Sequence, residues 1–512
     1  MDRKSNLLRN TFVGTGCYFV TLLIGFVTRT IFIYLLGQDY LGINGLFTNI
    51  LSLLCFAELG IGTAISFALY KPIADENERE IAALMNFYKN AYRGIAVFIA
   101  VAGLGLTPFL DVFIKDSPDV EHLELYYILI LADTVASYCM TYKRSLVVAS
   151  QNSYVDSINK ALFTLLQNAL QIIILLITHS YILFLAIRIC TTLGSNIAIS
   201  IKADKMFPYL KKHKKEHIEK KTLKSIIKNV AAMMCSKFGG VVVTGTDNLL
   251  ISAFVGVRHV ALYSNYIMIN TMISGVINQI YSAATATVGN LNATVDEEHS
   301  LSAFKKMYFV NFVMISTCSV FLYVLFNPFI KLWIGEDYLF PMVTVGVIVM
   351  NFFITGMRNT SITYINTYGL FWQIKYKSVI EAVINVVASL ILLVKFDMGI
   401  YGVLLGTTIS TVTTNVWWEP YVVFKYKFRR SVLPHLLTLG GYTLITFLIC
   451  ILCRYASSLC QIDGFAGFVL KGIICAVIDF GVIFAVFGRT ENFGYCVDAA
   501  KVFCSKIIKK HS

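Results

Sequence analysis

The chain is a succession of apolar stretches, most of them long enough to cross a lipid bilayer. A helix of about 20 apolar residues spans the hydrocarbon layer. Of the 512 residues, 57% are hydrophobic and only 14% are charged, with a mean hydropathy of +0.69. Ordinary soluble domains carry roughly a quarter of charged residues. The sequence therefore predicts an all-α polytopic membrane protein.

Hydropathy divides the chain into about fourteen expected transmembrane helices. Their approximate bounds are 12–36, 41–70, 83–110, 122–149, 159–178, 181–201, 226–254, 260–290, 306–334, 340–368, 374–395, 399–424, 433–457 and 464–488. The first stretch is too long for the apolar core of a signal peptide, and no small-residue cleavage site follows it. We therefore expect it to be retained as a helix.

The positions of the basic residues predict the orientation of the chain. With the N-terminus placed in the cytoplasm, 33 of the 43 Lys and Arg residues fall in inner segments, six in outer segments and four inside spans. Cytoplasmic loops carry such an excess of positive charge, so both termini are expected on the inside. This distribution also accounts for the net charge of +13 without a nucleic-acid partner.

Residues 28–62 contain two apolar helices joined by a short turn, and each helix carries one ionisable group. Arg29 lies in the first helix, Gly37–Gly42 form the turn, and Glu58 lies in the second helix. A charged group in hydrocarbon is costly, so such groups face a bundle interior or a wet cavity and often mark a transport path. This stretch is therefore a candidate part of such a path.

A second copy of this pattern follows about 219 residues later. Leu36-Gly37 aligns with Val255-Gly256 at a shift of 219 residues. Thr107-Pro108 aligns with Asn327-Pro328 at a shift of 220 residues. The first and seventh expected helices both run outward, which indicates a parallel repeat with substrate handled between the two halves. The expected organisation is an N-terminal six-helix lobe (1–201), a basic cytoplasmic linker (202–225), a second six-helix lobe (226–424), two accessory helices (425–490) and a cytoplasmic amphipathic tail (491–512).

The same stretch supports a family resemblance. Arg29, Gly37, Tyr40-Leu41-Gly42 and Glu58-Leu59-Gly60-Ile61-Gly62 are similar to the start of Wzx-type polysaccharide flippases, which belong to the multidrug/oligosaccharidyl-lipid/polysaccharide (MOP) exporter superfamily. The resemblance implies a bacterial cytoplasmic-membrane transporter, not an enzyme. It implies movement of undecaprenyl-pyrophosphate-linked oligosaccharide from the inner to the outer leaflet by alternating access, driven by an ion gradient or the membrane potential. Expected partners are this substrate, membrane lipids and polysaccharide assembly proteins.

Five basic residues are candidates for contact with the pyrophosphate. They are Arg29, Arg144, Arg188, Lys237 and Arg358. Arginine suits two-point binding of phosphate, and several cations at different depths could form a cavity for an anionic lipid headgroup. The alternative is that each cation neutralises a nearby acid and only fixes the packing of helices. For any single residue the two interpretations weigh about equally.

Four acidic residues are candidates for pairing with these cations or for carrying Na⁺ or H⁺ as the coupling ion. They are Glu58, Asp133, Asp247 and Glu381; Asp479, outside the repeat, is a weaker candidate. Comparison of depths in the bilayer favours a buried pair of Arg29 with Asp133. Asp247 follows Gly245, and a helix broken there could hold a cation, although a packed polar patch is equally consistent.

Other functions remain open. No G-x-x-x-x-G-K-[ST] loop or metal-ligand pattern occurs, so neither direct ATP drive nor a metal site is expected. Cys450 and Cys453 fall within an expected span and are interpreted as apolar packing residues. The alternatives are a flippase for lipid-linked peptidoglycan precursor, a cation-coupled multidrug exporter, and a membrane glycosyltransferase that uses a lipid-linked donor.

Overall fold

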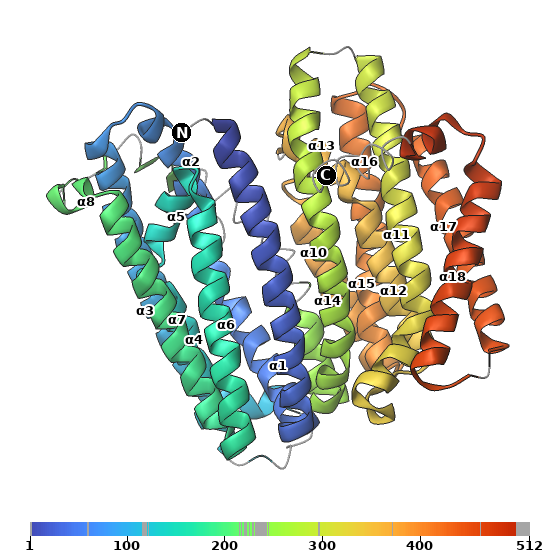
Figure 1. Ribbon diagram of the computed structural model, residues 1–512, viewed down its shortest axis with the longest axis horizontal. Coiled ribbons are helices and arrows are strands. Elements are labelled where there is room, and N and C mark those ends of the chain that lie inside the picture. Colours follow the sequence, from blue (N-terminus) through green and yellow to red (C-terminus); the bar gives the residue numbers. More distant parts are fainter. Residues whose placement is uncertain are drawn as a thin grey trace, which may run out of the picture. The chain divides into compact units, whose positions relative to one another are not determined.

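The computed structural model describes residues 3–58, 61–114, 120, 122–213, 243, 245–294, 297–370, 372–460 and 462–497, with scattered positions from 216 to 230. Within these ranges the chain forms helices and turns, and none of it lies in a strand (Figure 1). The fold class predicted from hydropathy is therefore confirmed. The chain forms two compact units, unit 1 (Met1–Ser264) and unit 2 (Asn265–Ser512).

Unit 1 begins with a long helix and continues through a series of helices joined by short turns. Its elements are α1 (Arg3–Leu54), η1 (Cys55–Glu58), α2 (Ile61–Ala74), α3 (Glu78–Leu106), η2 (Thr107–Phe113), α4 (Leu123–Tyr138), α5 (Tyr142–Ala149), α6 (Ser153–Thr178), α7 (Tyr181–Met206), α8 (Tyr209–Lys212), the π-helix η3 (Ile251–Val255) and the start of α10 (Val257–Thr294). Helix α6 packs against both α1 and α7, and α4 packs against α7.

Unit 2 also consists of helices and short turns, and its last two helices lie outside the predicted repeat. Its elements are the rest of α10, then α11 (Glu297–Ile334), η4 (Glu336–Tyr338), α12 (Met342–Met357), α13 (Asn359–Tyr368), η5 (Trp372–Ile374), α14 (Lys377–Leu390), the π-helix η6 (Ile391–Lys395), α15 (Ile400–Thr413), α16 (Asn415–Tyr426), α17 (Leu433–Ser458) and α18 (Gly464–Phe487).

Many large apolar side chains are exposed at the surface, although the interior is also largely apolar. Large apolar side chains are exposed, for example Ile177 at 71% and Val477 at 69%, whereas Asn311 and Asn385 are fully buried. Exposed apolar surface of this extent is typical of helices that contact hydrocarbon. The chain is a multi-pass membrane protein.

The described helices follow the expected spans, although fewer of them qualify as single membrane-length helices. Ten are long and apolar enough to cross a membrane, or eleven if the pair α4 and α5, bent by 43°, counts as one. Helix α1 merges the first expected span with part of the second, across a kink at Gly37. Helices α15 and α16 divide the span 399–424 into pieces of 14 and 12 residues, and about half of the span 226–254 lies outside the described residues.

The two glycines that align in the repeat share an unusual backbone conformation. Gly37 has φ 84° and Gly256 has φ 125°, both in a region that side chains with a Cβ rarely adopt. The equivalence of the prolines is less close. Pro108 begins the 3-10 segment η2, whereas Pro328 lies inside α11, which continues to Ile334. Of the two predicted correspondences, the glycines therefore agree in backbone conformation and the prolines do not.

Replacement of Gly37 or Gly256 by Ala is expected to lower the free energy of unfolding by about 1–2 kcal/mol each, because Ala must adopt positive φ. A Cβ at Gly37 would meet no atom within 4 Å, so the loss there comes from the backbone alone. Thermal unfolding in detergent measures the effect. Gly25→Ala is the control, since Gly25 lies in the same helix without positive φ and also has open space around it. Equal melting temperatures for Gly37→Ala and Gly25→Ala would contradict the backbone argument.

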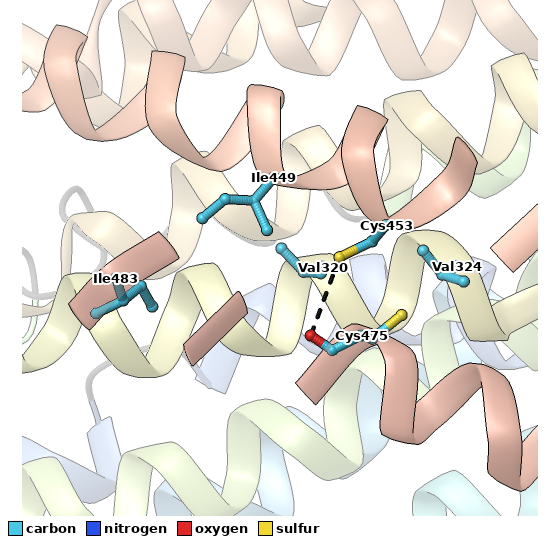
Figure 2. Close-up of a cluster of buried hydrophobic side chains, with 6 residues drawn as sticks. All are labelled: Val320, Val324, Ile449, Cys453, Cys475 and Ile483. Atoms are coloured by element: carbon cyan, nitrogen blue, oxygen red, sulfur yellow. Dashed lines mark hydrogen bonds between the residues drawn. The ribbon is translucent and has the colours of Figure 1, made fainter. Parts of the chain in front are cut away.

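The two accessory helices pack onto α11 through a small apolar core. Val320 and Val324 of α11 meet Ile449 and Cys453 of α17 and two further buried residues of α18, Cys475 and Ile483 (Figure 2). The Cys453 Sγ lies 4.0 Å from the Cys475 carbonyl oxygen. This buried position agrees with the interpretation of Cys453 as a packing residue.

The segments after α7 and α18 are described in part. Asn86 of α3 donates to the carbonyl oxygens of His213 and Glu216, which holds the first part of the predicted linker against α3. Residues 491–497 are helical, as the amphipathic pattern predicts, and the rest of the tail lies outside the described residues. The start of this tail contacts α11, since Lys306 lies 2.8 Å from Glu491. The lysine lowers the pKa of the exposed Glu491 carboxyl group.

Candidate functional site

Arg144 is the centre of a polar network in unit 1. Its Nη1 donates to Asp156 Oδ1 at 2.7 Å. Its Nη2 donates to Ser195 Oγ at 2.6 Å and to Asn196 Oδ1 at 3.2 Å. The other carboxylate oxygen of Asp156 lies 2.7 Å from Lys160 Nζ. Arg144 and Lys160 thus share the carboxylate of Asp156, and the three side chains together carry one net positive charge.

This network borders a polar cavity of about 330 Å³. The cavity is lined mainly by cationic, hydroxyl and amide side chains and one aromatic ring: Ser137, Thr141, Arg144, Lys160, Phe163, Thr164, Gln167, Thr191, Thr192, Ser195 and Asn196. The Lys160 side chain is 60% exposed, whereas that of Arg144 is 13% exposed. The volume of the cavity lies at the lower end of the range for small-molecule sites. Its lining is suited to an oxygen-rich ligand with negative charge.

Asp133 forms a second ion pair beside this cavity, with Arg188. Arg188 Nε lies 2.7 Å from Asp133 Oδ2, and Thr192, which lines the cavity, donates to Asp133 Oδ1 at 2.7 Å. The predicted partner, Arg29, instead donates to Ser264 Oγ at 2.5 Å. The reason is that α4, which carries Asp133, packs on α7, which carries Arg188. The predicted pair of Arg29 with Asp133 is therefore wrong, and Asp133 pairs with Arg188 instead.

Glu58 ends a chain of hydroxyl groups rather than an ion pair. The hydroxyl group of Tyr92 donates to Glu58 Oε1, and the Tyr88 hydroxyl lies 2.9 Å from that of Tyr92 and 3.1 Å from Ser145 Oγ. Tyr88 and Tyr92 are buried in α3. This arrangement holds an acidic group within the bundle, as expected for an intramembrane carboxylate.

The remaining predicted residues of this part of the chain are Asp247 and Lys237. Asp247 is buried, with 5% of its surface exposed, and residues 245–250 are helical. The predicted helix break at Gly245 is not found within residues 245–250, and a Cβ at Gly245 would lie 2.5 Å from Leu53 Cδ2. The irregular turn comes later, in the π-helix η3 and at Gly256. Lys237 lies outside the described residues.

Arg358 belongs to a buried ion cluster in unit 2. It lies between α12 and α13, and its Nε and Nη2 donate to the two carboxylate oxygens of Glu419 at 2.9 and 2.7 Å. Lys377 Nζ also binds Glu419, at 2.5 Å. The side chains of Glu419 and Lys377 are only 2% and 7% exposed. Burial makes such a cluster highly sensitive to the loss of one partner.

Glu381 lies near this cluster and completes its charge balance. It accepts a hydrogen bond from Asn415 Nδ2 and interacts electrostatically with Arg358. One turn further along α14, Asn385 donates to Thr407 of α15 at 2.9 Å. Arg358 and Lys377 therefore oppose Glu381 and Glu419, and the cluster has no net charge.

Three of the predicted cations, Arg144, Arg188 and Arg358, each bind an acid, which is the contact expected under the packing interpretation. Lys377 and Glu419 were not predicted as site residues. Glu419 lies within an expected apolar span and was detectable by the rule that identified the other acids. Lys377 lies near a span end, where hydropathy places a lysine in the adjoining loop.

The arrangement of helices matches that of solved membrane transporters. A lipid II flippase, MurJ, in an inward closed conformation has a TM-score of 0.65 at 14% identity, over 93% of this chain and 99% of that chain. An inward-facing multidrug resistance MATE transporter of the MOP superfamily has a TM-score of 0.63 at 15% identity, over 80% and 98%. A mutant of the Vibrio cholerae MATE transporter VcmN has a TM-score of 0.57 at 14% identity, over 82% and 95%.

The helices are therefore arranged as in these solved transporters, one of which is described as a member of the MOP superfamily. The sequence model of the family described as "Polysaccharide biosynthesis protein" matches residues 7–286. The chain belongs to this family. A comparison with curated proteins found no match.

Proposed function

We propose that the chain is a flippase that moves undecaprenyl-pyrophosphate-linked oligosaccharide units from the inner to the outer leaflet by alternating access. The observation that carries this proposal is the polar cavity of unit 1, lined by Arg144 and Lys160, in a chain of the polysaccharide biosynthesis family. A pyrophosphate leaving water needs cationic partners, and a glycan needs hydroxyl and amide partners. The cavity offers both.

Asp156 is the acid that holds the two cations of the cavity wall. It binds Arg144 and Lys160 at 2.7 Å each, which neutralises part of their charge. A phosphate group that approaches the exposed Lys160 competes with Asp156 for the two cations. Because both cations lie on the wall of one cavity, they can follow the phosphate without a change of fold. This exchange makes binding reversible, as a transporter requires.

Coupling to an ion gradient is assigned to Glu58 and Glu381, which form no direct salt bridge among the described residues, although Glu381 also faces Arg358. Glu58 accepts from Tyr92, and Glu381 accepts from Asn415. Either carboxylate can take up a proton, or bind Na⁺ together with the neighbouring hydroxyl or amide oxygens. No other cofactor is part of the proposal. The protein acts as a transporter and not as an enzyme.

The expected location is the bacterial plasma membrane with both termini in the cytoplasm. The inner segments carry most of the 43 Lys and Arg residues, which supports this orientation. Polysaccharide assembly proteins are the expected partners on the outer side, where the flipped unit is consumed. The neighbour named lipid II flippase supports a lipid-linked substrate, and peptidoglycan precursor is the second candidate cargo. The two cations of the polar cavity disfavour a multidrug exporter of cationic compounds.

The direct test is transport in proteoliposomes. The purified protein is reconstituted with fluorescently labelled undecaprenyl-pyrophosphate oligosaccharide, and movement between leaflets is followed by quenching from one side. We expect protein-dependent transport that accelerates under an imposed Na⁺ or H⁺ gradient. Lipid II and a cationic dye serve as competing substrates. Transport of the dye alone, or formation of glycosidic bonds, would reject the proposal.

A further inference from the structure

Unit 2 contains a second cavity, larger and much less polar than that of unit 1. Its volume is about 650 Å³, within the range of sites that hold small ligands. Side chains from α11, α12, α15, α16 and α17 line it, among them Tyr308, Phe353, Val412, Trp417, Leu439 and Phe447. A cavity with such walls does not hold water well.

The cavity is elongated along α17. The residues of α17 that line it begin at His435 and end at Phe447, with Leu439 and Gly440 between them. They recur at intervals of three and four, so one face of the helix borders the cavity. At 1.5 Å per residue this face is about 18 Å long. That length is close to the thickness of the hydrocarbon of one leaflet, about 15 Å.

One end of the cavity carries hydrogen-bond donors. Tyr308 is 3% exposed, and its hydroxyl group has no hydrogen-bond partner among the described residues. Its ring centroid lies 4.4 Å from that of His435, near the start of α17. Asn311, one turn along α11 from Tyr308, donates to the carbonyl oxygen of Gly356, which places Arg358 at a similar level. The two bonds of Arg358 to Glu419 use Nε and Nη2, which leaves Nη1 for a ligand.

The rim of the cavity is formed by exposed apolar side chains. Leu444 and Phe447 are 58% and 61% exposed, and Val412 and Trp417 are 44% exposed each. In a multi-pass membrane protein, exposed apolar side chains of this kind contact lipid chains. An occupant therefore arrives from the hydrocarbon and not from the water phase.

We propose that this cavity binds one acyl chain of a bilayer phospholipid. The chain lies along α17 between Leu439 and Phe447, and the ester or phosphate oxygens accept hydrogen bonds from Tyr308 and Arg358. The match between the cavity and one leaflet favours a phospholipid, because an undecaprenyl chain is far longer than the cavity. The site is separate from the cargo site proposed in unit 1 and does not depend on it.

The test uses two neighbouring glycines as a matched pair. A Cβ at Gly440 or at Gly441 would meet no atom within 4 Å, so either position accepts a larger side chain. Gly440 lines the cavity and Gly441 does not. A leucine side chain at Gly440 projects into the cavity and narrows it, whereas one at Gly441 does not line it.

Native mass spectrometry of the protein in detergent, supplemented with phosphatidylglycerol, measures the bound lipid. We expect one retained phospholipid per wild-type and Gly441→Leu chain, and at least a tenfold lower occupancy for Gly440→Leu. Tyr308→Phe, which keeps the ring and removes the hydroxyl group, is expected to weaken binding severalfold. Equal occupancy in Gly440→Leu and Gly441→Leu, absence of bound phospholipid in the wild type, or its displacement by undecaprenyl phosphate would overturn the proposal. The readout is independent of flipping, so failure of one proposal leaves the other standing.

Discussion

Replacement of Glu419 by Gln is expected to destabilise unit 2 by about 3–5 kcal/mol, the usual effect of removing one partner from a buried ion pair. Glu419 is 1% exposed and binds both Arg358 and Lys377. Without its charge, two buried cations face only Glu381. Thermal unfolding in detergent and the amount of protein in the membrane measure the loss.

Two further variants separate this charge effect from a general intolerance of substitution. Glu419→Gln combined with Lys377→Met removes one acid and one cation, so it is expected to recover most of the stability. Glu336→Gln is the exposed control, because the side chains of Glu336 and its partner Lys331 are 69% and 52% exposed. Such surface pairs contribute about 0–1 kcal/mol. If Glu419→Gln were as stable as Glu336→Gln, the cluster would not hold unit 2 together.

Replacement of Arg144 by Ala is expected to reduce export of the lipid-linked oligosaccharide at least tenfold. Arg144 is the cation of the polar cavity that reaches an acid, a hydroxyl group and an amide at once. Arg144→Lys keeps the charge but loses two-point binding, so we expect an intermediate rate. Transport of labelled substrate in proteoliposomes measures the rate, and the melting temperature reports on folding.

The control lies one residue away. Lys143, also in α5, pairs with Asp204 at 2.6 Å and does not line the cavity, so Lys143→Gln is expected to export normally.

The variant Asp156→Asn distinguishes a role of Arg144 in binding phosphate from a role in helix packing. If Arg144 binds phosphate, removal of its competitor leaves substrate affinity unchanged or raises it. If Arg144 only fixes the packing of helices, Asp156→Asn and Arg144→Ala are both expected to lower the melting temperature and to lose export. Normal export by Arg144→Ala would refute the cargo site.

The sequence predicted the broad architecture because that depends on composition along the chain. Apolar runs set the helices, and the alignment of Gly37 with Gly256 located two turns that share positive φ. Partners across helices were harder to predict. Position along a helix gives the depth of a residue in the bilayer but not the direction in which it points. Arg29 and Arg188 were both at a plausible depth for Asp133, and only the packing of α4 on α7 selects Arg188.

The charge balance of the ion cluster in unit 2 could not be predicted either, because hydropathy does not show which residues near a span end are buried. A lysine at a span end, such as Lys377, is assigned to a loop by hydropathy, although the fold buries it beside Glu419. The cavities depend on side chains from helices distant in sequence, and no local pattern shows them. The polar lining of the unit 1 cavity, for example, combines Arg144 of α5 with Thr192 and Asn196 of α7.

The positive φ at Gly37 and Gly256 favours glycine at both positions, whatever the protein transports. Charged contacts are under no such backbone constraint, and they differ between the two units. Unit 1 now has a surplus cation beside its cavity, whereas the ion cluster of unit 2 is neutral. Distant relatives should accordingly be recognised by paired glycines at this spacing, even where every ionic contact has been exchanged.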